Sequence, residues 1–289
     1  MTDPQARALE QRLNGLCDAQ PFTTSFHVRH VASGRAIARA GDVPTPSAST
    51  RKIAYLMVAL QAVHEGRLDL AETVELEPRL LEGVVSGVFY FMTPGLKFPL
   101  RDALVQMIIT SDNTCTTLVG ERLGVPALNA FCRRVGMEGT QIRHIVPPRE
   151  MPVDADFDFV AQTTPDDQVR LLDLILRGAA GDEQAVAALG CTPALCRLAL
   201  DFLSWQRYRT LIPGLLPIDA KVANKTGSGR NGMMDAGIVY RGGKPLYLIA
   251  AYTDRVPWTM PDGLPGHAAA THTIASISRA CWDAWGEHA

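Results

Sequence analysis

A serine and a lysine, Ser49 and Lys52, stand three residues apart just ahead of a long apolar run. On a helix this spacing puts a hydroxyl and an amine on one face, about one turn from each other. The free N–H groups and the positive dipole end of a helix N-terminus favour developing negative charge. A neutral amine nearby makes such a serine nucleophilic, and burial close to other cations keeps a lysine neutral. The pair predicts nucleophilic chemistry at Ser49, although a helix cap followed by a solvated lysine has the same spacing.

A second polar motif, Ser111-Asp112-Asn113, falls in a short link between two predicted helices. Alternate residues of such a link can point the same way, so Ser111 and Asn113 are expected to face one site. Ser111 can relay a proton to a leaving group, and Asn113 can hold either the substrate or Lys52. Alone, the triplet is a common helix cap.

A third motif, Lys225-Thr226-Gly227, lies on a predicted strand. Lys225 adds positive charge to the cleft and thereby helps to keep the first lysine neutral. Gly227 has no side chain, so a substrate can approach the strand backbone closely. The backbone N–H groups of Ser49 and Ser228 can then form an oxyanion hole, with each donor contributing about 3 kcal/mol or more. The three motifs in this order predict one acyl-transfer site.

The elements that must position these residues lie at both ends and in the middle of the chain. Alternating patterns predict strands over residues 23–31 and 35–40 and, near the other end, over 220–225, 234–240 and 246–252. Helical periodicity is found over residues 4–17, 49–66, 100–110, 114–123, 126–136, about 164–205 and 268–285. Residues 141–162 lack any periodicity, which is typical of a functional loop.

Strands at both ends with helices between them predict an α/β (α+β) fold with an antiparallel sheet flanked by helices. We expect residues 1–45 and 206–289 to form an α/β sandwich and residues 46–205 to form an all-α lobe. Clefts form where such parts meet, so the active site is expected between them.

Composition argues against several partners and cofactors. The formal net charge of −2 gives no reason to expect nucleic acid or an anionic membrane, and no apolar run approaches the ~20 residues that span a bilayer. The six cysteines and seven histidines lack metal-ligand spacing, so neither a metal nor a cofactor is predicted. Since the start of the chain lacks a secretory pattern, we expect a cytoplasmic protein, the alternative being a leader already removed. The oligomeric state stays open.

The three motifs are those of class A β-lactamases and penicillin-binding proteins. Over about residues 25–285 the chain resembles a class A β-lactamase-like serine hydrolase. Further likeness lies in Leu100-Arg101-Asp102-Ala103-Leu104, in Thr163-Thr164-Pro165 after the long loop, and in Asp235-Ala236-Gly237-Ile238-Val239. The resemblance implies an α/β sandwich with an all-α lobe, and catalysis by Ser49, Lys52, Ser111 and Lys225.

The loop ahead of Thr163 departs from this family. Class A enzymes carry Glu-x-x-Leu-Asn there, and the glutamate activates the water that deacylates the enzyme. Residues 146–154 read Val-Pro-Pro-Arg-Glu-Met-Pro-Val-Asp instead, with Pro148 near the place of the glutamate. Glu150 is the nearest substitute as deacylation base, and an exposed loop acid is its other interpretation. The more distant acids are Asp154, Asp156 and Asp158.

Recognition of a substrate carboxylate also differs. Class A enzymes commonly place an arginine on the strand after Lys-Thr-Gly, near the position of Asp235 in this chain. Arg230, together with Thr226 and Ser228, is the candidate substitute, because arginine has the fork geometry that binds a carboxylate. A solvated turn residue is the other interpretation of Arg230.

These departures favour a serine hydrolase or acyltransferase that cleaves a small amide or ester through an acyl-Ser49 intermediate. In such an esterase, amidase, peptidase or transacylase, Lys52 or another group serves both steps. One alternative is a working β-lactamase with an unusual deacylation base. Another is a non-catalytic protein whose cleft holds an acyl ligand.

Overall fold

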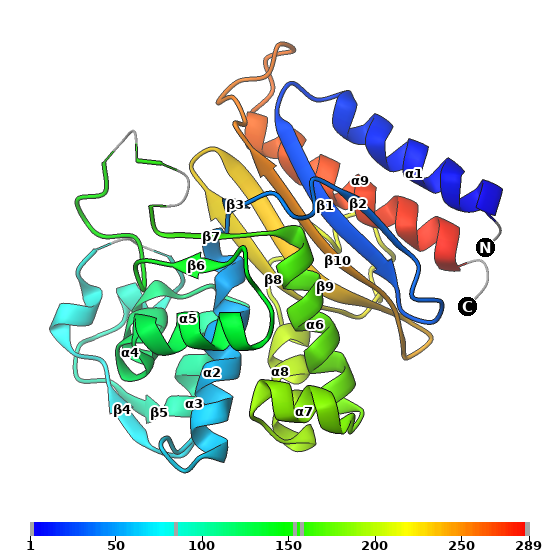
Figure 1. The fold of residues 1–289 in the computed structure, drawn as a ribbon. Helices are drawn as coiled ribbons and strands as arrows, with labels where there is room; N and C mark the ends of the chain where they lie inside the picture. Colours follow the sequence, from blue (N-terminus) through cyan, green and yellow to red (C-terminus); the bar gives the residue numbers. More distant parts are fainter. Residues whose placement is uncertain (1–2, 84–85, 153–154, 157–158, 287–289) are drawn as a thin grey trace.

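Five antiparallel strands form the central sheet in the order β2-β1-β10-β9-β8 (Figure 1). The computed structural model describes residues 3–83, 86–152, 155–156 and 159–286. The sheet strands are β1 (Thr23–His30), β2 (Ala36–Arg39), β8 (Val222–Gly229), β9 (Gly232–Arg241) and β10 (Lys244–Asp254). The two ends of the chain therefore build one sheet, and the α/β class is as predicted.

Both faces of the sheet are covered, because side chains alternate along its strands. On β10 the alternation separates two buried clusters. One cluster includes Leu248, Ala250 and Tyr252 and is packed against helices from the middle of the chain. The other takes Tyr247, Ile249 and Ala251 and is covered by α1 (Asp3–Asp18) and α9 (Gly266–Gly286), which lie side by side (Figure 1).

The middle of the chain supplies the helices on the other face. They are α2 (Lys52–His64), α3 (Leu100–Ile109), α4 (Asn113–Leu123), α5 (Val125–Arg134), α6 (Pro165–Ala179), α7 (Glu183–Leu189) and α8 (Pro193–Ser204). Helix α2 is buried on nearly every side, as its continuous apolar run requires. Helix α6 packs directly on β1, β9 and β10. The helical segment and the sheet thus share one buried cluster.

The segment expected to be all-α also contains short strands. They are β3 (Thr45–Pro46), β4 (Thr73–Glu75), β5 (Lys97–Pro99), β6 (Gln141–Ile142) and β7 (Ala161–Thr163). Strands β6 and β7 stand at the two ends of the long aperiodic loop and pair with each other, while β3 pairs with β7. The loop is therefore held at its base by a small sheet. The division at residues 45 and 206 stays a prediction.

Within the described residues, no single helix has the length and hydropathy needed to cross a membrane. The pair α7 and α8 passes that test only when taken together, and it is bent by 74° at the break between them.

The site lies where the edge of the sheet meets the start of α2. Strand β8 is an edge strand, so one side of its backbone is not paired within the sheet. The short 3₁₀ helices are η1 (Ala48–Arg51), η2 (Pro78–Leu81) and η3 (Phe89–Phe91), and η1 packs against β8. This contact brings the first motif next to the third.

Candidate active site

Ser49 lies on the 3₁₀ helix η1 rather than on the first turn of the α-helix, which begins at Lys52. In a 3₁₀ helix residues three apart eclipse each other, so the predicted facing of serine and lysine survives this difference. The N–H of Ser49 lies in the first turn, where backbone donors have no partner within the helix. The Ser49 side chain is half-buried and lines a cavity.

Lys52 is completely buried, and its amine contacts the second motif. Its Nζ donates to the carbonyl oxygen of Ser111 at 2.7 Å and to Asn113 Oδ1 at 2.8 Å, and it lies 3.2 Å from Ser111 Oγ. Burial lowers the pKa of Lys52 well below its ordinary value, and the charges of Lys225 and Arg51 lower it further. A neutral amine has two N–H groups, both used here by oxygen acceptors, so its lone pair is left to accept a proton.

The second motif is fixed by the carboxylate of Asp112. Its Oδ1 accepts from the N–H of Cys115 at 2.9 Å and caps α4, and its Oδ2 accepts from the N–H groups of Val88 and Phe89 at 2.7 Å each. Ser111, directly before it, has φ of 57°, which a serine rarely adopts. The carboxylate therefore holds the link in a conformation that aims Ser111 at Lys52.

The carbonyl oxygen of Ser111 has a second donor. Ser86 Oγ lies 3.0 Å from it, and Ser86 O accepts from the N–H of Asn113 at 3.0 Å. The carbonyl oxygen of Ser111, which accepts from Lys52 Nζ, is thus also held by the Ser86 hydroxyl. This contact adds Ser86 to the groups that shape the site.

Strand β8 places Lys225 beneath the cavity, where its Nζ donates to the carbonyl oxygen of Thr226 at 2.7 Å. Burial lowers the pKa of Lys225 to about 7, Arg51 acts in the same direction, and Asp235 opposes both. Asp235 is itself buried, which raises its pKa to about 7. Its oxygens accept from Asn224 Nδ2 at 3.0 Å and from the N–H of Ile212 at 3.1 Å. Asp235 therefore lies inside the protein and does not face a substrate.

Gly227 brings the strand backbone close to the nucleophile. A Cβ built on Gly227 would lie 2.9 Å from Ala48 Cβ and 3.1 Å from the backbone nitrogen of Ser49, which leaves no room for a side chain. Since Ser228 follows directly, its N–H belongs to the same wall as that of Ser49. The close approach is what the predicted oxyanion hole requires.

A cavity of about 270 Å³ opens above these groups. Its catalytic side carries residues of all three motifs, namely Ser49, Ser111, Thr226, Gly227 and Ser228, together with Ser86. Its opposite wall is formed by Tyr208, Thr210, Leu211 and Met233. Asn113 belongs to the site through Lys52 and lines a neighbouring pocket with Pro147 and Pro148.

The structure does not bring Glu150 or Arg230 to this cavity. Glu150 is exposed on the long loop, and it is not among the described residues that line the cavity. Arg230 lies in the turn between β8 and β9 and lines a different, larger pocket, as does Asp156. Asp154 and Asp158 lie outside the described residues. The geometry therefore favours neither Glu150 as a deacylation base nor Arg230 as a partner for a carboxylate at Ser49.

Arg51, like Ser86, is a residue of this site that sequence reasoning missed. It is only 3% exposed, and it donates to the carbonyl oxygens of Ala48 and Ile145, the latter at 3.2 Å. A signal was available, because Arg51 immediately precedes a helix that is apolar on every side and therefore had to start inside the protein.

Comparison with known proteins places this arrangement in a family. No curated protein matches the chain. The beta-lactamase from Sphaerobacter thermophilus DSM 20745 is 23% identical with a TM-score of 0.81, over 96% of this chain and 97% of that one. PBP-A is 27% identical with a TM-score of 0.79, over 97% and 96%, and a mutant of PBP-A has been solved as an acyl-enzyme complex with penicillin-G. A family model described as the beta-lactamase enzyme family matches residues 8–285, and the chain therefore belongs to that family.

Proposed function

We propose that this protein is a serine hydrolase or acyltransferase that cleaves a small amide or ester through an acyl-Ser49 intermediate. The observation that carries the proposal is the fully buried amine of Lys52, which contacts Ser111 and whose pKa is lowered by burial, next to a cavity lined by Ser49 and Ser111. When such an amine is neutral and its N–H groups donate to oxygen atoms, its lone pair can accept the proton of the serine hydroxyl.

In the acylation step proposed here, each of these groups has one role. Ser49 Oγ attacks the acyl carbon, and its proton passes to Lys52 Nζ. The N–H groups of Ser49 and Ser228 stabilise the negative charge that forms on the acyl oxygen. The proton then moves through Ser111 Oγ, which is 3.2 Å from Lys52 Nζ, to the leaving amine or alcohol. The bond to the leaving group breaks as the acyl-Ser49 ester forms.

The second step, deacylation of acyl-Ser49, lacks a carboxylate in the place of the loop glutamate that class A enzymes use. None of the described residues that line the Ser49 cavity is acidic. Lys52, once it has passed its proton to the leaving group, is the remaining base that can activate water or an acceptor alcohol. We therefore expect acylation to be faster than deacylation, so that acyl-Ser49 accumulates.

The mass of the intact protein, followed over time, tests the proposal. Penicillin-G, a cephalosporin and 4-nitrophenyl acetate are the probes. A lasting adduct supports the slow second step proposed here. Rapid penicillin turnover would instead favour a working β-lactamase with another deacylation base. Ligand binding detected by calorimetry, with no adduct and no turnover, would favour the non-catalytic alternative.

Replacing the nucleophile gives the matched variants. Ser49→Ala is expected to abolish all covalent labelling with little change in the free energy of unfolding, because the side chain is half-buried in an open cavity. Ser228→Ala keeps the backbone N–H that the oxyanion hole uses and should still be labelled. Labelling that persists in Ser49→Ala would remove Ser49 as nucleophile.

A further inference from the structure

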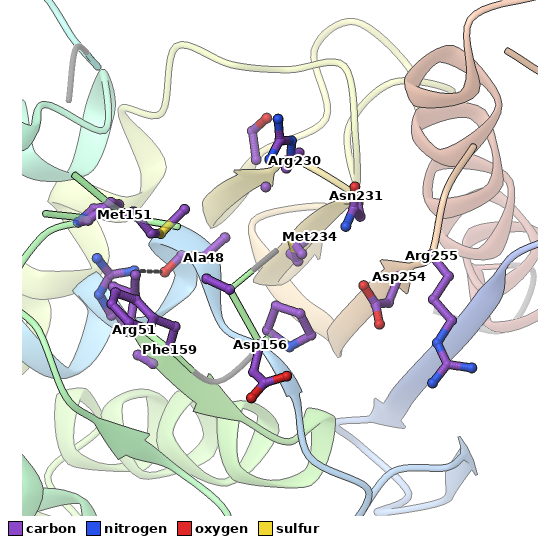
Figure 2. A pocket seen from close by; sticks show the side chains of 18 of the residues that line it. Ala48, Arg51, Met151, Asp156, Phe159, Arg230, Asn231, Met234, Asp254 and Arg255 are labelled. Carbon is purple, nitrogen blue, oxygen red and sulfur yellow. Dashed lines mark hydrogen bonds between the residues drawn. The ribbon is translucent and has the colours of Figure 1, made fainter. Parts of the chain in front are cut away.

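The peptide bond between Ala48 and Ser49 lies at the boundary of two adjoining cavities, which share Ser228 as a lining residue. Ser49 lines the catalytic cavity, whereas Ala48 lines a second pocket of about 400 Å³ (Figure 2). In a trans peptide the carbonyl oxygen and the N–H point in opposite directions. The N–H of Ser49 can therefore serve the oxyanion hole only while the carbonyl oxygen of Ala48 points away from the catalytic cavity.

Arg51 holds that carbonyl oxygen from the side of the second pocket. Its Nη1 donates to Ala48 O, the contact drawn in Figure 2, and its Nη2 donates to Ile145 O at 3.2 Å. The planar guanidinium thus joins the nucleophile turn to the beginning of the long loop. A hydrogen bond from a charged donor is roughly twice as strong as a neutral one.

The conformation at Ala48 needs such a restraint. Its φ is 40°, in the left-handed region that a residue with a Cβ rarely adopts. The other side-chain donor to its carbonyl, Ser47 Oγ, is 3.3 Å away. Gly227 packs against Ala48 Cβ and the Ser49 nitrogen on the opposite side and supplies no side-chain donor. The i→i+3 backbone bonding of η1, which begins at Ala48, also orients this carbonyl. Arg51 adds the charged donor that strengthens the restraint on this peptide.

We propose that Arg51 is a positioning residue that preorganises the oxyanion hole, by holding the Ala48–Ser49 peptide with its N–H directed into the catalytic cavity. The guanidinium also draws electron density toward Ala48 O, which makes the Ser49 N–H a stronger donor. Arg51 touches neither the nucleophile hydroxyl nor the reacting carbonyl. This inference rests on the proposed acyl-Ser49 chemistry.

Arg51→Gln tests the proposal. We expect acylation by 4-nitrophenyl acetate to slow by about 10- to 100-fold, somewhat less than complete removal of a donor, because the peptide can still visit the productive orientation. Removing the charge of Arg51 is also expected to raise the pKa of Lys52, whose other ionisable neighbours are Lys225, Asp112 and Cys115. The rates are therefore compared on the pH-independent plateau of each enzyme.

A spectroscopic readout separates positioning from a general loss of packing. Acetyl-Ser49 made from ester labelled with ¹³C at the carbonyl carbon has a stretching frequency that falls as hydrogen bonds to the carbonyl oxygen strengthen. In Arg51→Gln this frequency is expected to rise and its band to broaden. An unchanged plateau rate with an unchanged frequency would overturn the proposal.

Tyr55→Phe is the matched control. Tyr55 OH is the other side-chain donor to Ile145 O, also at 3.2 Å, and it interacts with the Arg51 side chain. Among the described residues, the side-chain donors to Ala48 O are Arg51 and Ser47 rather than Tyr55. The control is expected to keep nearly the wild-type rate and frequency. Equal losses in both variants would mean that only the loop anchor at Ile145 matters, which would also refute the role assigned to Arg51.

Arg51→Lys covers the case in which Arg51→Gln does not fold, as judged by circular dichroism. A lysine keeps the charge but cannot span both carbonyl oxygens with a planar fork. Arg51→Lys should show a smaller decrease in the acylation rate and a smaller rise in the carbonyl frequency than Arg51→Gln. A wild-type rate and frequency in Arg51→Lys would contradict the proposal. Failure of the wild-type protein to form any Ser49 adduct would instead refute the proposed function itself.

Discussion

The buried amine of Lys52 forms hydrogen bonds with the carbonyl oxygen of Ser111 and the amide oxygen of Asn113 instead of with water. A charged ammonium in such a place is costly unless an opposite charge is in contact with it. Asp112, the nearest acid with an effect on its pKa, uses its carboxylate to hold backbone N–H groups instead. At the scale of the residue, the surroundings of Lys52 therefore favour its uncharged form.

Lys52→Met is expected to lower the acylation rate by about 10²- to 10⁴-fold, the usual contribution of a positioned base. In the wild-type protein the rate should rise with pH through the lowered pKa of Lys52, because only the neutral amine accepts a proton. The variant should lose this dependence. Stopped-flow measurement of acylation checks both points. Lys97→Met, at an exposed lysine, is the control and should keep the wild-type profile.

The sequence predicted the grouping of Ser49, Lys52 and Ser111 because the residue types in the three motifs directly indicate their chemical roles. It did not predict the part played by Arg51, because the carbonyl oxygens that it binds belong to a tight turn and to a distant loop. Glu150 is the opposite case, and its role as a base stays a prediction. Its residue type suits a base, but the path of the long loop leaves it exposed.

At the scale of the element, the loop over residues 86–89 locks the start of α4. Gly87 lies against the backbone and carboxylate of Asp112, and a Cβ there would lie 2.6 Å from Asp112 Cβ. The two N–H groups that bind the carboxylate follow directly in the chain. Close packing by a residue without a side chain therefore sets the position of the second motif.

Gly87→Ala is expected to lower the free energy of unfolding by about 1–3 kcal/mol through overpacking and positive φ, and to slow acylation because Ser111 shifts. Gly83→Ala is the matched control. Its φ of 115° also disfavours alanine, but an added Cβ would meet no atom within 4 Å. Urea unfolding and acylation rates of both variants check the prediction. Equal acylation rates in the two variants would show that the clash with Asp112 does not matter.

Among the elements, strands with clear alternation or strong apolar character were predictable, as β1 and β10 show. The strands β3, β6 and β7 were not, since two or three residues carry no periodicity and their pairing is set by tertiary contacts. The start of α2 was placed three residues early, because a 3₁₀ turn and an α-helix begin with the same kind of sequence.

At the scale of the whole molecule, the buried lysines link the site to global stability. The pKa of Lys225 is about 7 in the folded protein, against an ordinary value of 10.5. Between these values the unfolded chain binds more protons than the folded one, so the free energy of unfolding rises with pH. Lys52 acts in the same direction. Burial raises the pKa of Cys17 and Cys132 to about 11 and 12, which opposes this trend above about pH 9.

We therefore expect the free energy of unfolding to increase between pH 7 and 9, with each buried lysine contributing at most about 1.4 kcal/mol per pH unit. Below pH 7 the raised pKa of Asp235 acts in the opposite direction, because the folded protein then holds the extra proton. Guanidinium unfolding at several pH values measures the slope. Lys225→Met should reduce it, and an unchanged slope in that variant would contradict the assignment.

The strand order also has a consequence for how the protein is made. Strand β1 is synthesised well before β10, yet β10 is its neighbour on the inner side of the sheet. At 5–20 residues per second, the roughly 200 residues between them take about 10–40 s to leave the ribosome. During that time the side chains of Phe26 and Val28, which are buried in the folded protein, lack the residues of β10 and α9 that belong to the same buried cluster. We therefore expect the apolar face of β1 to stay exposed, and able to bind chaperones, until the last hairpin has been synthesised.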